Sequence, residues 1–138
     1  VWIHAPDLPA MAPRLLRLGL PLVVDHMGRM ATARGVDDPG FVHLCRMLER
    51  GEAWTKISGA DRNTAGECGY ADVDPFARAL LQANPARVVW GSDWPHVTEK
   101  AHPPDTAMLL ALLSRWIPDA ATREQVLVAN AARLYRFE

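Results

Sequence analysis

Short apolar runs alternate with longer amphipathic segments along the 138 residues of the chain. Four of these runs have the length of a β-strand, are rich in Val, Ile or Trp, and are bounded by Gly, Pro or charged residues, which is typical of strands. They are VWIHA (1–5), LVVDH (22–26), AWTKISG (53–59) and RVVWGSD (87–93). The last three carry Asp25, Ser58 and Ser92 near their ends, at intervals of 33 and 34 residues. That spacing leaves room for one helix between consecutive strands, as a parallel crossover requires.

The segments between and after these runs predict helices. Residues 38–51 repeat apolar side chains at the i, i+3, i+4 and i+7 spacing of an amphipathic helix, with Pro39 in the first turn and Gly51 as the stop. Similar patterns cover 7–19, 73–85, 103–118 and 121–137. Four of the predicted helices begin at a recognisable cap, namely Asp38, Asp74, Asp105 and the box formed by Thr122 and Gln125.

This order of elements predicts an α/β protein with about four parallel strands, each followed by a helix. We expect one partial domain over residues 1–138, related to the (β/α)8 barrel, in which eight such units make about 250 residues. The chain starts without Met and inside an apolar run, so we also expect strands to be missing before residue 1.

Four strands are too few to close a barrel around a core of side chains. We therefore predict an open sheet with helices on its outer face only. Its inner face, with Val23, Ile57 and Val89, should then be unusually exposed, and self-association through that face is expected.

Composition narrows the function classes. Hydrophobic residues make up 49% and charged residues 22%, the formal net charge is −1, and Lys and Arg form no cluster, so neither nucleic acid nor a membrane surface is an expected partner. The longest strongly apolar stretch, AMLLALL, is too short to span a bilayer. No signal peptide is visible, and two cysteines, Cys45 and Cys68, fit reduced thiols, so a cytoplasmic location is expected.

Polar side chains gather at or just after the ends of the apolar runs. They are His4, Asp25, His26, Ser58 and Asp93, followed within a few residues by Arg29, Arg62 and His96. Because the carboxyl ends of parallel strands meet at one edge of the sheet, where α/β proteins carry their sites, we expect these side chains to converge.

Four stretches, VVDHMGRM, WTKISGADR, VVWGSDWPHV and NAARLYRF, resemble the last four units of the amidohydrolase-2 family, nearest the branch of 2-pyrone-4,6-dicarboxylate lactonase. The resemblance runs through essentially the whole chain in order and spacing. It implies the C-terminal half of a (β/α)8 TIM barrel, strands five to eight. It also implies a hydrolase that opens a lactone or similar ester of a small carboxylated ring compound, with no cofactor.

The resemblance also suggests roles for individual residues. Asp93 is expected to take a proton from the attacking water and pass it to the leaving group. His26 is expected to polarise the substrate, and Arg29 and Arg62 to bind its carboxylates, which suit the planar guanidinium. His96 is a candidate hydrogen-bond donor to substrate.

Two alternatives stay open from the sequence. Some family members use a divalent metal, and His4, His26 and Asp93 offer three ligands for zinc in a metal-dependent hydrolase or decarboxylase. The other alternative is a truncated, non-catalytic half-barrel that serves as a binding module. Such a module would have no reason to keep Asp93, His26, Arg29 and Arg62 together, so their presence favours the enzyme. Two unpaired sheet edges, on the other hand, argue against an active fragment.

Overall fold

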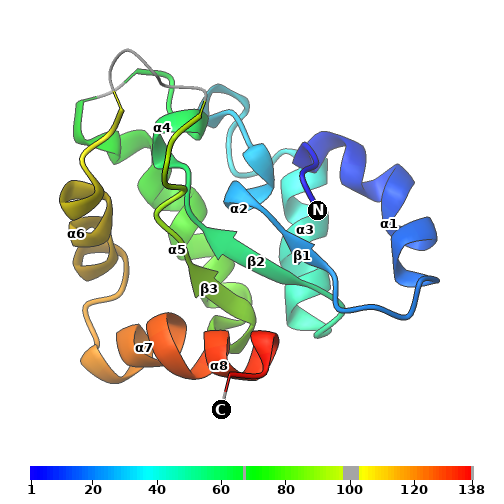
Figure 1. The fold of residues 1–138 in the computed structure, drawn as a ribbon. Helices are drawn as coiled ribbons and strands as arrows, with labels where there is room; N and C mark the ends of the chain where they lie inside the picture. The colour runs from blue at the N-terminus through cyan, green and yellow to red at the C-terminus, as the bar shows by residue number, and fades with distance from the viewer. Residues whose placement is uncertain (67, 98–102, 138) are drawn as a thin grey trace.

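The computed structural model describes residues 1–66, 68–97 and 103–137. Three parallel strands lie side by side at its centre in the order β1-β2-β3 (Figure 1). They are β1 (Val23–Val24), β2 (Trp54–Ile57) and β3 (Val88–Trp90). Val24 pairs with Thr55, which in turn pairs with Val88, so these three residues lie side by side across the parallel sheet. This sheet with its crossover helices is half of a (β/α)8 barrel.

Helices connect the strands and complete the chain. The longer ones are α1 (Leu8–Leu16), α3 (Pro39–Glu49), α5 (Asp74–Ala83) and α6 (Thr106–Trp116). The shorter ones are α2 (His26–Arg29), α4 (Ala60–Asn63), α7 (Ala120–Glu124) and α8 (Asn130–Tyr135), with a π turn at Gln125–Ala129 joining the last two. Single 3-10 turns lie at Ala5–Asp7, Thr32–Arg34, Cys68–Val73 and Pro85–Arg87.

The sheet has three strands among the described residues, one fewer than the sequence predicts. The run 1–5 forms no strand, although its first residue lies along the edge of β1. The amino group of Val1 donates to the Val23 carbonyl, and Asp25 N donates to the Val1 carbonyl at 3.1 Å, which is the pattern of a parallel pair. Because a 3-10 turn starts at Ala5 and only Val1 is paired, the run does not extend into a strand.

The core lies between the sheet and the helices α3 and α5, which lie behind it in Figure 1. Val24, Ile57 and Val88 are fully buried there, in one cluster with Leu44 of α3 and Leu80 of α5. These three strand residues alternate with others that point to the opposite face, as the pleat requires. The apolar stripe read from the sequence of residues 38–51 therefore packs as predicted.

The prediction of an exposed apolar inner face is wrong. Ile57 and Val89 are 0% and 1% exposed, and Val23 is partly buried. Ile57 belongs to the helix-covered face, and the other face carries Val23, Trp54, Lys56 and Val89. The exposed apolar surface of the other face is thus smaller than the pattern of apolar residues in the sequence suggests. Self-association stays a prediction, but without this support.

Charged side chains and the C-terminal segment cover that other face. Lys56 Nζ lies 2.7 Å from Asp25 Oδ1. The guanidinium groups of Arg87 and Arg133 lie 5.0 and 4.8 Å from the centre of the Trp54 ring. Helices α7 and α8 cross the lower end of the sheet in Figure 1. Polar contacts that the strand pattern cannot reveal thus close the face.

Local caps confirm two predicted helix starts and correct two others. Asp38 and Asp105 cap α3 and α6, accepting from backbone N–H groups at 2.9 and 2.8 Å. Asp74, however, is the first residue of α5, and its Oδ1 instead accepts from Arg115 and Trp116 of α6. The final helix begins three residues earlier than the predicted box, because Asp119 accepts from the backbone N–H and the hydroxyl of Thr122.

The lengths of the helices and the state of one cysteine can be read from the structure. None of the helices in the described ranges is long and apolar enough to cross a membrane. Cys45 is a free thiol, and burial raises its pKa to about 11. It therefore stays protonated at neutral pH, as a structural rather than a reactive cysteine does. The side chain of Cys68, the other predicted thiol, lies outside the described part.

Candidate active site

The three strands deliver polar side chains to one edge of the sheet, where the sequence places the site. His26 follows β1, Ser58 follows β2, and Asp93 lies three residues beyond the end of β3. His26 Nδ1 is 2.9 Å from Ser58 Oγ, and its Nε2 is 3.5 Å from Asp93 Oδ1. The predicted convergence of His26 and Asp93 is confirmed, and Ser58 joins them with a direct contact that the spacing alone does not reveal.

Four of the predicted site residues have left-handed backbone conformations. The φ angles are 54° at His26, 47° at Arg29, 62° at Asp93 and 53° at His96. Each costs about 1–2 kcal/mol for a residue with a side chain. Such backbone outliers are retained where the surrounding structure holds them, and they cluster at functional sites. Their concentration after β1 and β3 supports the assignment of this edge as the site.

His26 is held on several sides and is 9% exposed. Asn63 Nδ2 donates to its carbonyl at 3.0 Å, and a Cβ added at Gly59 would lie only 3.0 Å from its Nδ1. Burial lowers the pKa of His26, an effect that the charges of Asp93 and Asp25 oppose. The ring is therefore neutral at neutral pH. A neutral imidazole offers one donor and one acceptor nitrogen.

Arg62 is bound to the carboxylate of Asp93. Its Nε donates to Oδ2 at 2.5 Å, and the two side chains are 9% and 17% exposed. One oxygen of Asp93 thus faces a guanidinium while the other faces the His26 ring. The pair fixes the position of the carboxylate at this edge of the sheet.

Arg29 lies at the same edge but beside the first residues of the chain. Its Nη1 is 3.2 Å from His4 Nε2, and its guanidinium stacks 3.6 Å from the centre of the Trp2 ring. Its Nε is buried without a hydrogen-bond partner in the described structure. Burial and the positive charge of Arg62 lower the pKa of Arg29.

The three predicted metal ligands do not come together as a set. His26 and Asp93 are neighbours, whereas both ring nitrogens of His4 lie against Arg29, at 3.2 and 3.3 Å. A guanidinium so close to His4 disfavours a cation there.

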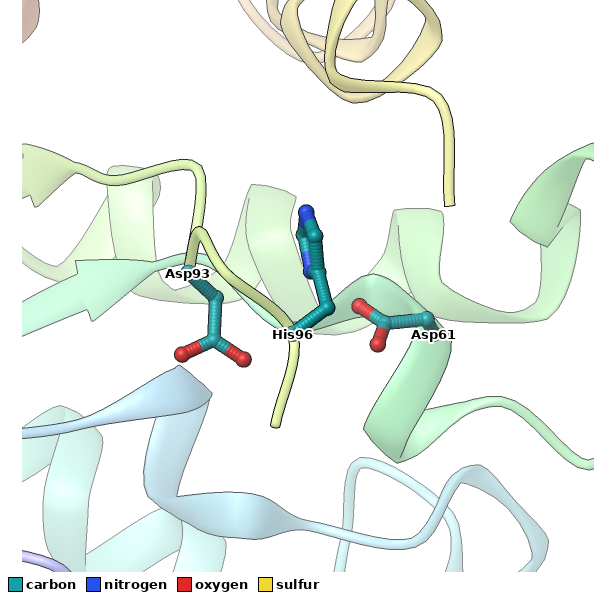
Figure 2. A group of neighbouring side chains, drawn as sticks. All are labelled: Asp61, Asp93 and His96. Atoms are coloured by element: carbon teal, nitrogen blue, oxygen red, sulfur yellow. The ribbon is translucent and has the colours of Figure 1, made fainter. Parts of the chain in front are cut away.

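Another trio gathers at the edge. Ligand atoms of Asp61, Asp93 and His96 lie within 4.8 Å of one another. Figure 2 shows Asp61 on α4, with its carboxylate directed toward the loop that carries Asp93 and His96. His96 is 3% exposed, and neither its ring nitrogens nor the oxygens of Asp61 have a hydrogen-bond partner in the described structure. Burial raises the pKa of Asp61.

This donor set, two carboxylates and an imidazole, fits a divalent ion such as zinc in kind. Zinc in proteins is tetrahedral with ligands about 2.0–2.2 Å from the ion, which places the ligands about 3.3–3.6 Å from one another, so the trio would have to draw closer. The sequence interpretation missed Asp61 and Asn63. The signal was present, since both follow the same strand end as Arg62 within the GADRN stretch.

The sequence matches the Amidohydrolase family over residues 1–137. The chain belongs to the amidohydrolase family. It is 40% identical over 134 residues to a 4-sulfomuconolactone hydrolase from Rhizobium radiobacter, a match that covers 95% of this chain and 45% of that protein. It is 37% identical over 144 residues to a 2-pyrone-4,6-dicarboxylate hydrolase from Comamonas testosteroni, covering 98% of this chain and 47% of that protein. The chain thus spans about half the length of the curated relatives it matches.

Solved structures of similar proteins have the same fold. An apo protein from Agrobacterium tumefaciens superposes with a TM-score of 0.87 at 34% identity, over 100% of this chain and 49% of that one. An amidohydrolase from Burkholderia multivorans with bound zinc superposes with a TM-score of 0.80 at 26% identity, over 100% of this chain and 52% of that one.

Proposed function

We propose that this amidohydrolase chain supplies the water-activating half of a lactone hydrolase whose substrate is a small ring compound bearing carboxylates. The main support is the position of the Asp93 carboxylate, which lies between Arg62 at 2.5 Å and the neutral ring of His26 at 3.5 Å. The relatives named above act, by their names, on lactones that bear sulfonate or carboxylate groups. Anionic substrates of that kind suit an edge that carries two arginines.

The chemistry follows from the donors and acceptors at the edge. A carboxylate has about four acceptor positions, and the two contacts of Asp93 leave room for a water. Asp93 takes a proton from that water as its oxygen bonds to the lactone carbonyl carbon. His26 hydrogen-bonds the oxyanion that develops. The ring C–O bond then breaks, Asp93 returns the proton to the leaving oxygen, and the products are a carboxylic acid and a hydroxyl.

The arginines supply substrate binding. Arg29 keeps a buried Nε without a partner in the described structure, which a substrate carboxylate can accept from. Arg62 already holds Asp93 and brings positive charge beside the reacting carbonyl. His96, buried with both ring nitrogens unpartnered among the described residues, is a further hydrogen-bonding group for substrate.

The test is steady-state hydrolysis of a panel of carboxylated lactones. Because the chain spans about half of its relatives, it is assayed alone and joined to the N-terminal half of the Rhizobium radiobacter hydrolase. In whichever form is active, Asp93→Asn should lower kcat by about 10²–10⁴-fold, since Asn cannot take the proton. Asp105→Asn is the matched control, because Asn also caps helices. Near-normal turnover by Asp93→Asn would show that the mechanism is wrong.

A second candidate is a metal-dependent hydrolase of the same family. It is favoured by the unpartnered Asp61 and His96 beside Asp93 and by the zinc in a solved relative. These three side chains would hold the ion, which when bound lowers the pKa of water toward 7. Loss of activity on dialysis against a chelator, restored by zinc, would favour this candidate over the metal-free one. The ligand set predicted from the sequence, which includes His4, is tested by repeating the dialysis with His4→Ala. If His4 is a ligand, zinc should restore less activity to this variant than to the unaltered protein.

The proposed setting is the cytoplasm, where free thiols such as Cys45 persist. The proposed partner is the small-molecule substrate itself. A non-catalytic half-barrel remains the alternative from another class. Binding of a carboxylated lactone without turnover, in both forms of the assay, would favour that alternative.

A further inference from the structure

The hydroxyl of Ser58 contacts the functional ring at the nitrogen that faces away from Asp93. Ser58 Oγ is 2.9 Å from His26 Nδ1, and both residues are buried, at 5% and 9% exposure. Ser58 is the first residue after β2, and a pleated strand fixes where such a residue points. The contact therefore joins the ring that follows β1 to the side chain that follows β2.

The second nitrogen of the ring decides which group donates in this contact. His26 Nε2 faces Asp93 Oδ1 at 3.5 Å, and a carboxylate only accepts hydrogen bonds. A lone pair on Nε2 would repel that oxygen, so in the neutral ring Nε2 carries the proton. Nδ1 is then an acceptor, and the partner that can donate to it is the Ser58 hydroxyl.

We propose that Ser58 is a positioning residue, whose hydroxyl donates to His26 Nδ1 and so holds the ring with its Nε2–H directed to the reacting centre. Gly59 leaves the space beside His26 free of a side chain, because a Cβ added there would lie 3.0 Å from Nδ1 and 3.1 Å from Cγ of the His26 ring. His26 then cannot rotate without losing the Ser58 bond. The consequence for catalysis rests on the proposed function, but the hydrogen-bond assignment does not.

The assignment has a chemical consequence for the two candidate mechanisms. A protonated Nε2 can hydrogen-bond an oxyanion, but it has no lone pair with which to bind a metal. Ser58 thus favours His26 as a donor to substrate and disfavours it as a zinc ligand through the nitrogen that faces Asp93.

The test is ¹⁵N NMR of the protein labelled in its histidine rings, at neutral pH and without metal. We expect a protonated Nε2 and an unprotonated, hydrogen-bonded Nδ1 for His26. Ser58→Ala should move the Nδ1 resonance toward that of an imidazole lacking the bond, and Ser58→Thr should restore it. Thr55→Val is the control, since it removes a buried hydroxyl of the same strand that donates at 3.0 Å to the Val24 carbonyl instead.

A proton on Nδ1 in the unaltered protein would overturn the proposal, and that measurement needs no variant to fold. An Nδ1 resonance unmoved in folded Ser58→Ala would overturn it too. In the active form of the lactone assay, Ser58→Ala should lower kcat about 3- to 10-fold with little change in KM. If no lactone is hydrolysed while the NMR pattern is as expected, the proposed function fails and the positioning role stands.

Discussion

The sharpest prediction concerns Gly59, which lies next to His26 of the candidate site. Its φ is +67°, and a Cβ added there would lie 3.0 Å from Nδ1 and 3.1 Å from Cβ of His26. Gly59→Ala carries a backbone cost of about 1–2 kcal/mol. Carbon contacts are favourable near 3.5–4.0 Å, so the ring must retreat by roughly 0.5 Å. That shift stretches the Ser58 bond and removes roughly 0.5–1.5 kcal/mol more.

A matched variant separates the two contributions. Gly19 has φ +65° and no atom within 4 Å of an added Cβ, so Gly19→Ala carries the backbone cost alone. We expect urea unfolding to show a loss of about 1.5–3.5 kcal/mol for Gly59→Ala and about 1–2 kcal/mol for Gly19→Ala. The ring resonances of His26 should shift in the first variant only. Equal losses of stability, with His26 unshifted in both, would refute the packing argument.

Two further predictions concern stability. Because burial lowers the pKa of His26, the unfolded chain binds the proton more tightly than the folded one. The free energy of unfolding should therefore be at its maximum above about pH 6.5 and fall as the pH drops below that value. The fall should be shallower in His26→Gln, and the same pH dependence in both proteins would contradict this. Asp38 accepts from Gly40 N and from Arg34 at 2.9 and 2.8 Å while 8% exposed, so Asp38→Ala should destabilise by about 1–2 kcal/mol. Asp105 is an exposed cap, so Asp105→Ala should destabilise less, by about 0.5–1 kcal/mol. If chemical denaturation ranks the two variants in the opposite order, the argument from burial is wrong.

The sequence by itself determined the features that depend on near neighbours along the chain. The caps at Asp38 and Asp105, the apolar stripe of α3 and the polar ends of the strands were all readable, because a cap or a stripe involves residues only a few positions apart. The convergence of His26, Ser58 and Asp93 at one edge followed as well. Parallel strands that end in polar residues must bring those residues to the same edge, whatever the details of packing.

Tertiary structure decided what depends on partners distant in sequence. Asp74 could serve as a local cap, yet Arg115 and Trp116 of α6 bind its carboxylate. Val1 pairs with the edge of β1, but a 3-10 turn follows at Ala5–Asp7, so the first apolar run does not continue into a strand. Trp54, beneath two arginines, helps to close a face that the strand pattern left open.

The contacts of the site itself also came from the fold. Ser58 and His26 are separated by 32 positions, and no local pattern states that their side chains lie 2.9 Å apart. The same holds for Asp61, whose unpartnered carboxylate lies near His96 only because α4 and the loop after β3 meet. Periodicity specifies which face of an element a residue occupies, whereas register, helix packing and loop conformation specify which side chain it touches. The sequence therefore identified the edge and most of its residues, and the packing of the strands decided how their hydrogen bonds connect.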